Sequence, residues 1–208
     1  MIAVRTLASP PVCEREILRY AGCRQADEGV LALLAECLSE ALPLLTYTVC
    51  FANVDPAPFT ARSEKLRENL DGCEQVLLIA ATIGVGIDRL IAKYGRLSPA
   101  KALLLQAIGT ERIEALCDTF CGELARETGL MPRPRFSPGY GDLSLEVQRE
   151  VITRLEAEKR VGVTLNDSFL MSPSKSVTAF VGLSRDRIKA VNKCRVCEKT
   201  DCAFRGAI

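Results

Sequence analysis

The segment RFSPGYG at residues 135–141 combines residue types that could hold a small anionic ligand. Arg135 offers five hydrogen-bond donors in a rigid fork. Gly139 and Gly141 permit backbone conformations closed to other residues, and Pro138 restricts its neighbours. A plain connection between two helices has the same composition. The segment alone therefore leaves two interpretations open, a ligand loop and a connector.

A second group of reactive side chains stands near the C-terminus, in KCRVCEKTDCAFR at residues 193–205. Cys194, Cys197 and Cys202 have the spacing C-x-x-C-x-x-x-x-C, which can bring three thiolates around a metal ion or an iron–sulfur cluster. Such sites usually need four ligands, so the fourth would come from Asp201, a distant cysteine, a second chain or an exogenous molecule. Zinc or an iron–sulfur cluster, redox-active thiols and an inert tail all remain open.

Composition excludes several classes of function. The chain has 208 residues, ten cysteines and no histidine, so catalytic triads and metal sites that need imidazole are ruled out. A net charge of +1 does not suit a nucleic-acid binder. The N-terminus lacks the pattern of a secretory signal, and the longest apolar run, 76–87, is shorter than the roughly 20 residues that cross a bilayer. We therefore expect a cytoplasmic protein with no nucleic-acid or membrane partner, whose cysteines are buried, redox-active or metal-binding rather than paired in disulfides.

Hydrophobic periodicity predicts a mixture of helices and strands. The predicted helices are 14–20 with Gly22 as its cap, 27–45, 63–70, about 88–94, 98–128 and 145–159. The predicted strands are 46–54, 73–84, 161–172 and 176–184, the last two joined at 173–175 as an antiparallel pair. Because no repeating βαβ order is present, the fold class is α+β.

The long helix 98–128 starts at Ser98-Pro99, a capping residue followed by proline, and stops at Gly129. Its apolar face comprises Ile113, Leu116, Cys117, Phe120, Cys121 and Leu124, so both cysteines are expected in the core. Glu114 and Asp118 lie one turn apart on the flank of this face. They are either a solvated edge or a pair of acceptors that face a ligand.

The sequence TIGVGIDR at 82–89 resembles a dinucleotide-binding turn only superficially. Gly84 and Gly86 are followed by Arg89 where that fingerprint needs a third glycine. We interpret it as a tight turn.

The order of motifs over residues 98–184 resembles the activation domain of cobalamin-dependent methionine synthase, which binds S-adenosylmethionine. The matching motifs are the Arg-x-x-x-Gly-Tyr turn, then Glu-Lys-Arg-x-Gly, then Ser-Phe-x-Met-x-Pro, then Ser-Val. The N-terminal half is similar only in general pattern. The resemblance implies mixed helices around a twisted, mainly antiparallel sheet. It implies one domain over 1–190, in which residues 1–97 form an N-terminal region and residues 98–190 bind S-adenosylmethionine, followed by a cysteine-rich tail 191–208.

The resemblance also implies a ligand set. Arg135 would contact the methionyl carboxylate, Gly139 would let the backbone approach the ligand, and Tyr140 would supply a flat apolar face with a polar tip. A helical glutamate of the family aligns less securely with Glu114, which would accept from the ligand's amino group. No catalytic residue is implied, because the sulfonium methyl is already activated and the nucleophile is the cobalt(I) of the partner.

The function that follows is that of a stand-alone reactivation factor in methionine biosynthesis. It would bind S-adenosylmethionine for the reductive methylation of an oxidised cobalt(II) cobalamin on a separate methionine synthase or other corrinoid protein. A flavodoxin- or ferredoxin-type protein would donate the electron. The chain is too short to hold the homocysteine, folate and cobalamin modules of a whole synthase. The alternatives are an S-adenosylmethionine-binding regulatory or redox module without methyl transfer and, with less support, a methyltransferase acting on a small thiol.

Overall fold

A five-stranded antiparallel sheet forms the centre of the molecule, with strand order β1-β2-β3-β7-β4. The computed structural model describes residues 1–23 and 25–186. The elements in chain order are β1 (Ile2–Thr6), α1 (Glu14–Tyr20), α2 (Glu28–Ala41), the 3-10 helix η1 (Leu42–Leu44), β2 (Thr48–Asn53), α3 (Ala57–Thr60), α4 (Glu64–Leu70), β3 (Gln75–Thr82), α5 (Gly86–Leu97), α6 (Pro99–Thr128), β4 (Met131–Pro132), α7 (Val147–Arg154), α8 (Ala157–Val161), β5 (Thr164–Leu165), β6 (Met171–Ser172) and β7 (Ser176–Ser184). The predicted α+β class is confirmed.

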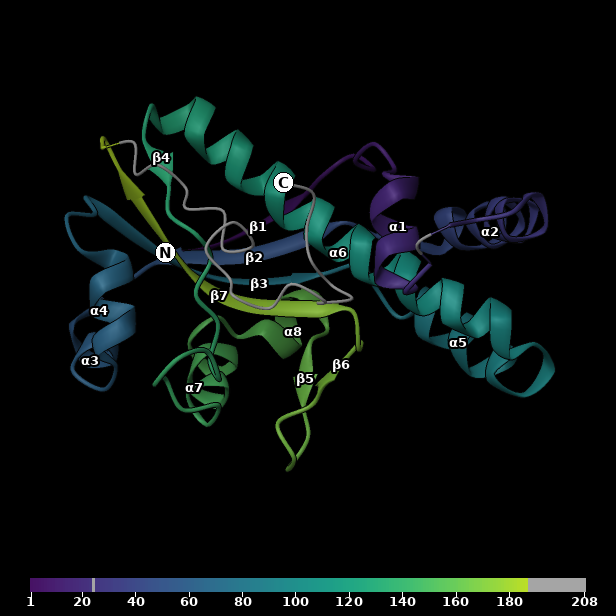
Figure 1. The fold of residues 1–208 in the computed structure, drawn as a ribbon. Coiled ribbons are helices and arrows are strands. Elements are labelled where there is room, and N and C mark those ends of the chain that lie inside the picture. The colour runs from purple at the N-terminus through teal and green to yellow at the C-terminus, as the bar shows by residue number, and fades with distance from the viewer. Residues whose placement is uncertain (24, 187–208) are drawn as a thin grey trace.

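Helices cover both faces of this sheet. Side chains alternate between the two faces along a strand, so neighbours on β3 enter different hydrophobic clusters: Ile79 packs with α1, α2, α5 and α6, whereas Leu78 packs with α3, α4, α7 and α8. Figure 1 shows α6 above the sheet and α3, α4, α7 and α8 below it. Because both faces are covered, β3 and β7 are almost wholly buried, which explains why 73–84 reads as a continuous apolar run.

Helix α6 is the longest element, with 30 residues and a length of about 45 Å at 1.5 Å per residue. Its first half extends past the sheet and packs on α2 and α5 (Figure 1). Its predicted apolar face is buried, Cys117 and Cys121 included, and Gly129 ends it in the left-handed conformation with φ +70°. The predicted start is also confirmed, although the Ser98 side chain makes no capping hydrogen bond.

Three predictions for residues 145–184 are wrong. The predicted helix 145–159 is two short helices, α7 and α8, because Glu156 takes a left-handed φ of +48° between them. The predicted strand 161–172 is the end of α8 followed by the two-residue strands β5 and β6. The Asn166 side chain accepts hydrogen bonds from the backbone of Ser168 and Leu170 and so turns the chain between these strands. No antiparallel pair therefore joins 161–172 to 176–184; β7 lies between β3 and β4 instead.

The remaining predicted elements are confirmed with small changes of boundary. Helix α1 has the predicted bounds, α2 ends before η1, and α5 is longer than predicted. Strand β1 and the short helix α3 were not predicted. In the 82–89 turn, a Cβ on Gly86 would collide with the carbonyl oxygen of Leu44, so this glycine lets α5 pack closely on η1.

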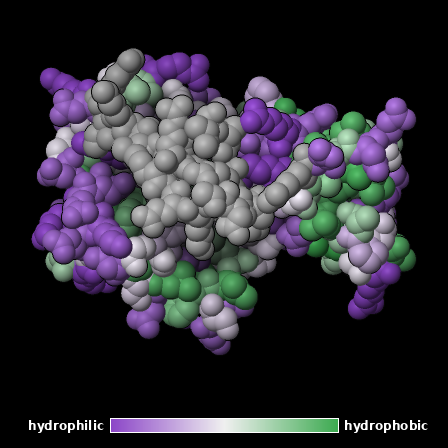
Figure 2. Space-filling view, viewed as in Figure 1, coloured by the Kyte–Doolittle hydropathy of each residue, from purple (hydrophilic) through white to green (hydrophobic). Residues whose placement is uncertain are grey.

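The surface differs between the two ends of the molecule. In the view of Figure 2, polar side chains dominate over α3 and α4, whereas apolar ones gather over the end formed by α2 and α5. Leu31, Leu97 and Leu103 are exposed large apolar residues of α2, α5 and α6. Within the described residues, no helix is both long and apolar enough to span a membrane.

Candidate functional site

Backbone pairing along β7 positions the arginine of the 135–141 loop. Arg133 donates its backbone N–H to the carbonyl oxygen of Gly182 at 2.7 Å, and Phe136 exchanges two backbone hydrogen bonds with Phe180, of 3.0 and 2.8 Å. Residues 131–136 therefore run along the sheet edge as an extended segment. Arg135 lies inside this segment, so its backbone is fixed by the sheet rather than by the turn that follows.

The turn after Arg135 is closed by its own backbone. The N–H of Gly139 donates to the carbonyl oxygen of Leu143 at 2.9 Å, and the N–H of Tyr140 donates to that of Ser137 at 3.0 Å. Gly139 has a φ of +86°, and a Cβ there would lie 3.3 Å from Cδ1 of Leu145. The turn itself thus requires a glycine at this position, whatever the ligand.

Asp142 fastens this turn to α4, a role that the sequence did not reveal. Its carboxylate accepts hydrogen bonds from the hydroxyl of Ser63 and from the N–H of Glu64, the latter at 2.8 Å. These bonds, that of Ser63 first, lower the pKa of Asp142. Because Ser63 also caps α4 by accepting from the N–H of Leu66, loop and helix share one hydrogen-bonded junction.

The Arg135 guanidinium binds two carboxylates of α6. Its Nη2 lies 2.5 Å from Oε2 of Glu114, and its Nη1 lies 2.5 Å from Oδ1 of Asp118. Only 21% of the Arg135 side chain is exposed, against 43% for Glu114 and 73% for Asp118. Burial opposes the positive charge, but the negative groups around it prevail and raise the pKa of Arg135, so it stays a cation.

The two cysteines beside this cluster are not reactive groups. Burial raises the pKa of Cys117 to about 12, and burial also raises that of Cys121. Both thiols therefore stay protonated near neutral pH and serve as apolar core, as predicted.

A pocket of about 360 Å³ opens between α1 and α6, next to the Arg135 cluster. Its lining consists of Pro10, Pro11, Cys13, Glu16, Tyr20, Glu111, Glu114, Ala115, Asp118 and Thr119. Glu114 and Asp118 thus belong both to the pocket wall and to the ion pairs with Arg135. Burial raises the pKa of the Tyr20 hydroxyl, so this ring is a neutral, half-buried wall. Each lining carboxylate pairs with an arginine, but Glu114 and Asp118 share one, so negative charge is in excess and favours a ligand that carries positive charge.

A buried ion pair builds the other wall of this pocket. Arg112 is fully buried; its Nε lies 2.5 Å from Oε2 of Glu111, and its Nη1 and Nη2 donate to the carbonyl oxygens of Pro10 at 2.6 Å and Pro11 at 2.7 Å. Glu111 also accepts from the N–H of Cys13 at 3.1 Å. The segment before α1 is therefore clamped to α6. The signal in the sequence was a charged pair, Glu111-Arg112, on the buried side of a long helix.

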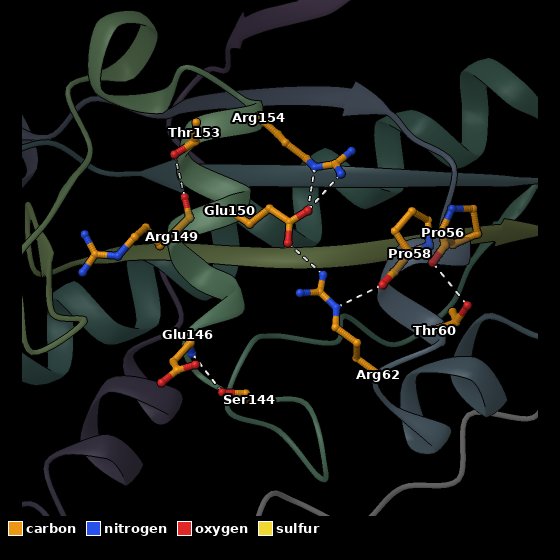
Figure 3. Close-up of polar contacts among 10 residues, drawn as sticks. All are labelled: Pro56, Pro58, Thr60, Arg62, Ser144, Glu146, Arg149, Glu150, Thr153 and Arg154. Atoms are coloured by element: carbon orange, nitrogen blue, oxygen red, sulfur yellow. Dashed lines mark hydrogen bonds and ion pairs between the residues drawn. The ribbon is translucent and has the colours of Figure 1, made fainter.

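A second hollow, of about 370 Å³, lies where α7 meets the α3–α4 junction. Figure 3 shows its central contact, in which Glu150 accepts from Arg62 at 2.8 Å and from Arg154 at 2.9 Å. Both guanidinium groups lie over the ring of Phe59, 5.2 and 4.9 Å from its centroid. The hydrogen bond from Arg62 is the main cause of the lowered pKa of Glu150. This cluster holds α7 against α3.

The structure brings some of the predicted site residues together. Arg135 and Glu114 are in contact, and Asp118 joins them. Of the four predicted ligand residues, Glu114 is in the lining of the 360 Å³ pocket, whereas Arg135, Gly139 and Tyr140 are not. Tyr140 is 54% exposed, with its ring 6.3 Å from that of Phe136. The ligand roles of all four stay predictions.

The predicted metal ligands Cys194, Cys197 and Cys202 lie outside the described residues. Over residues 1–23 and 25–186, no group of three or more Cys, Asp and Glu side chains is arranged to hold a metal ion.

No family model matches this chain, and no curated protein matches it in sequence. Among solved structures, the crystal structure of the MetH reactivation domain bound to AdoHcy is similar, with a TM-score of 0.59 over 90% of this chain and 80% of that chain. The two sequences are 15% identical. At that identity the likeness establishes a shared fold, and it agrees with the fold that the order of motifs predicted.

Proposed function

We propose that this chain is a cytoplasmic, free-standing activation module that binds S-adenosylmethionine for the reductive methylation of a separate corrinoid protein. The observation that carries the proposal is the Arg135 guanidinium, which binds Glu114 and Asp118, two carboxylates in the lining of the adjacent pocket. The order of motifs around Arg135 and the shared fold with a domain whose structure contains AdoHcy support the same ligand.

The proposal gives each of the three charged groups of the ligand a partner. The methionyl carboxylate would pair with Arg135, for which a guanidinium is better shaped than an ammonium. The amino group would donate to Glu114. The sulfonium would lie among the pocket carboxylates, and the pocket volume of about 360 Å³ is within the usual range for small-molecule sites.

The proposed reaction requires no catalytic side chain from this protein. The bound ligand would supply an already activated methyl group, and the nucleophile would belong to the corrinoid partner, reduced by an electron from a flavodoxin- or ferredoxin-type protein. Binding, orientation and exclusion of water are then the tasks of this chain. No side chain has to give or take a proton, which is consistent with a sequence that has no histidine.

The test is a reconstituted methylation. The chain, S-adenosylmethionine and a low-potential reductant are mixed with a cobalt(II) methionine synthase that lacks its own activation domain, and methylcobalamin is followed by absorbance. We expect formation to be faster with the chain than without it, and Arg135→Ala to remove the difference. If the ligand binds but stays intact with several corrinoid partners, the chain is a regulatory or redox module instead.

A further inference from the structure

The Arg135 fork is already occupied by the chain's own carboxylates. Each of its two terminal nitrogens faces one of them, Nη1 that of Asp118 and Nη2 that of Glu114. A ligand carboxylate that approaches this guanidinium end-on, with one oxygen at each terminal nitrogen, competes with them for the same two positions. Both carboxylates line the same pocket, so a ligand there approaches Arg135 along the side on which they lie.

Asp118 is the easier of the two to displace. Its side chain is 73% exposed and that of Glu114 is 43% exposed, so Asp118 recovers more of its hydration when it leaves the guanidinium. Ion pairs of exposed side chains contribute little to stability because water and salt compete with them. Arg135 itself is largely buried and stays in place as its partners change.

From this geometry we infer that Asp118 occupies the place of the ligand carboxylate in the free chain and is exchanged for it on binding, which makes Asp118 a determinant of ligand selectivity. The inference rests on the proposed function. The property by which the site would discriminate between ligands is an additional positive charge on the ligand. Once released, Asp118 remains at the pocket wall as an unneutralised negative charge. A ligand with an additional positive charge offsets that charge, whereas a zwitterion without one does not. The site should therefore favour S-adenosylmethionine, which carries a sulfonium, over S-adenosylhomocysteine, which does not.

The test is calorimetric titration of wild type and Asp118→Asn with three ligands. Asparagine keeps the shape of aspartate but neither competes as an anion nor attracts a cation. We expect S-adenosylhomocysteine to bind the variant about two- to fivefold more tightly, the range that an exposed ion pair is worth. S-adenosylmethionine should gain less, so that the preference for it falls. Decarboxylated S-adenosylmethionine has no carboxylate to compete, so the variant should bind it more weakly than wild type does.

Glu123→Gln is the matched control, because it removes a negative charge from the same helix at a residue that pairs with Arg5 and is not in the pocket lining. It should change none of the three affinities. If wild type binds the ligands and Asp118→Asn leaves every affinity unchanged, or raises all three equally, the exchange is refuted while the proposed function stands. If neither wild type nor the variant binds any of them, the proposed function and the exchange both fail.

Discussion

The protein has two clusters of arginine and carboxylate, and their composition is opposite. In one, the single cation Arg135 is shared by Glu114 and Asp118. In the other, the single anion Glu150 is shared by Arg62 and Arg154, which also rest on an aromatic ring. The first cluster has one more negative than positive charge and adjoins a pocket, and its partner Asp118 is largely exposed. In the second cluster the anion is paired with two cations, and the cluster holds α7 against α3.

The difference shows that an ion pair by itself does not indicate a binding site. What distinguishes the Arg135 cluster is a largely buried cation with one largely exposed partner, Asp118, beside a pocket. The Arg62 cluster instead holds α7 against α3, and Asp142, which joins the loop to α4, lines the hollow beside it. A change in one cluster should therefore leave the other's role intact.

Arg135→Ala should give the largest effect. Losing a charged contact to the ligand carboxylate removes about 1.5–3 kcal/mol, which is about tenfold to more than a hundredfold in affinity for S-adenosylmethionine. Titration calorimetry measures it, with circular dichroism to show that the variant folds. Arg62→Ala is the matched control from the second cluster and should bind as wild type does. Equal affinity in wild type and Arg135→Ala would mean that Arg135 does not contact the ligand, so that neither cluster is a binding site.

A smaller effect concerns Cys13, an exposed thiol in the lining of the 360 Å³ pocket. Bound S-adenosylmethionine should cover it and slow its alkylation by iodoacetamide severalfold, as followed by mass spectrometry. Cys73 is half-buried and is not among the lining residues, so its labelling rate should not change. Equal rates at Cys13 with and without ligand would place the ligand elsewhere around Arg135.

The smallest effect concerns stability. Glu150→Gln removes both ion pairs of the second cluster and should lower the free energy of unfolding by about 1 kcal/mol at pH 7. The folded-state pKa of Glu150 is lowered from 4.5, so its contribution is complete above that value and disappears as the pH falls through the folded-state pKa. Urea unfolding of variant and wild type should therefore differ at pH 7 and converge in acid.

Glu146→Gln serves as its control. The carboxylate of Glu146 forms no ion pair with any described residue, although Glu146 lines the same hollow, so this variant should match wild type at every pH. A difference between wild type and Glu150→Gln that persists in acid would show that the charge is not its origin.

Local patterns were enough for much of the fold. The boundaries of β7 and of α1, the long helix with its Gly129 stop and the burial of Cys117 follow from periodicity and from end signals within the segment itself. The order of motifs also pointed to Arg135 and Glu114, which the structure places in contact.

Features that depend on contacts with other segments of the chain could not be predicted from local sequence patterns. Strand β1 has only five residues, and its pairing with β2 makes it a strand, since its own burial pattern is irregular. The segment 161–172 alternates like a strand, but the hydrogen bonds of Asn166 fold it back on itself. From the sequence, Asp118 could only be placed one turn from Glu114 on the flank of the apolar face. Which carboxylate contacts Arg135 depends on how the loop lies against α6.

The clamp on the Pro10-Pro11 segment has a consequence for the order of events during synthesis. Arg112 and Pro10 are 102 residues apart, so the wall that Pro10 forms cannot be fastened until α6 has been made past that arginine. At about 5–20 residues per second, the N-terminal segment waits roughly 5–20 seconds for its partner on the ribosome. The pocket between α1 and α6 is therefore fastened only after residue 112 has been made, and a chain halted before that residue would lack the arginine that holds Pro10.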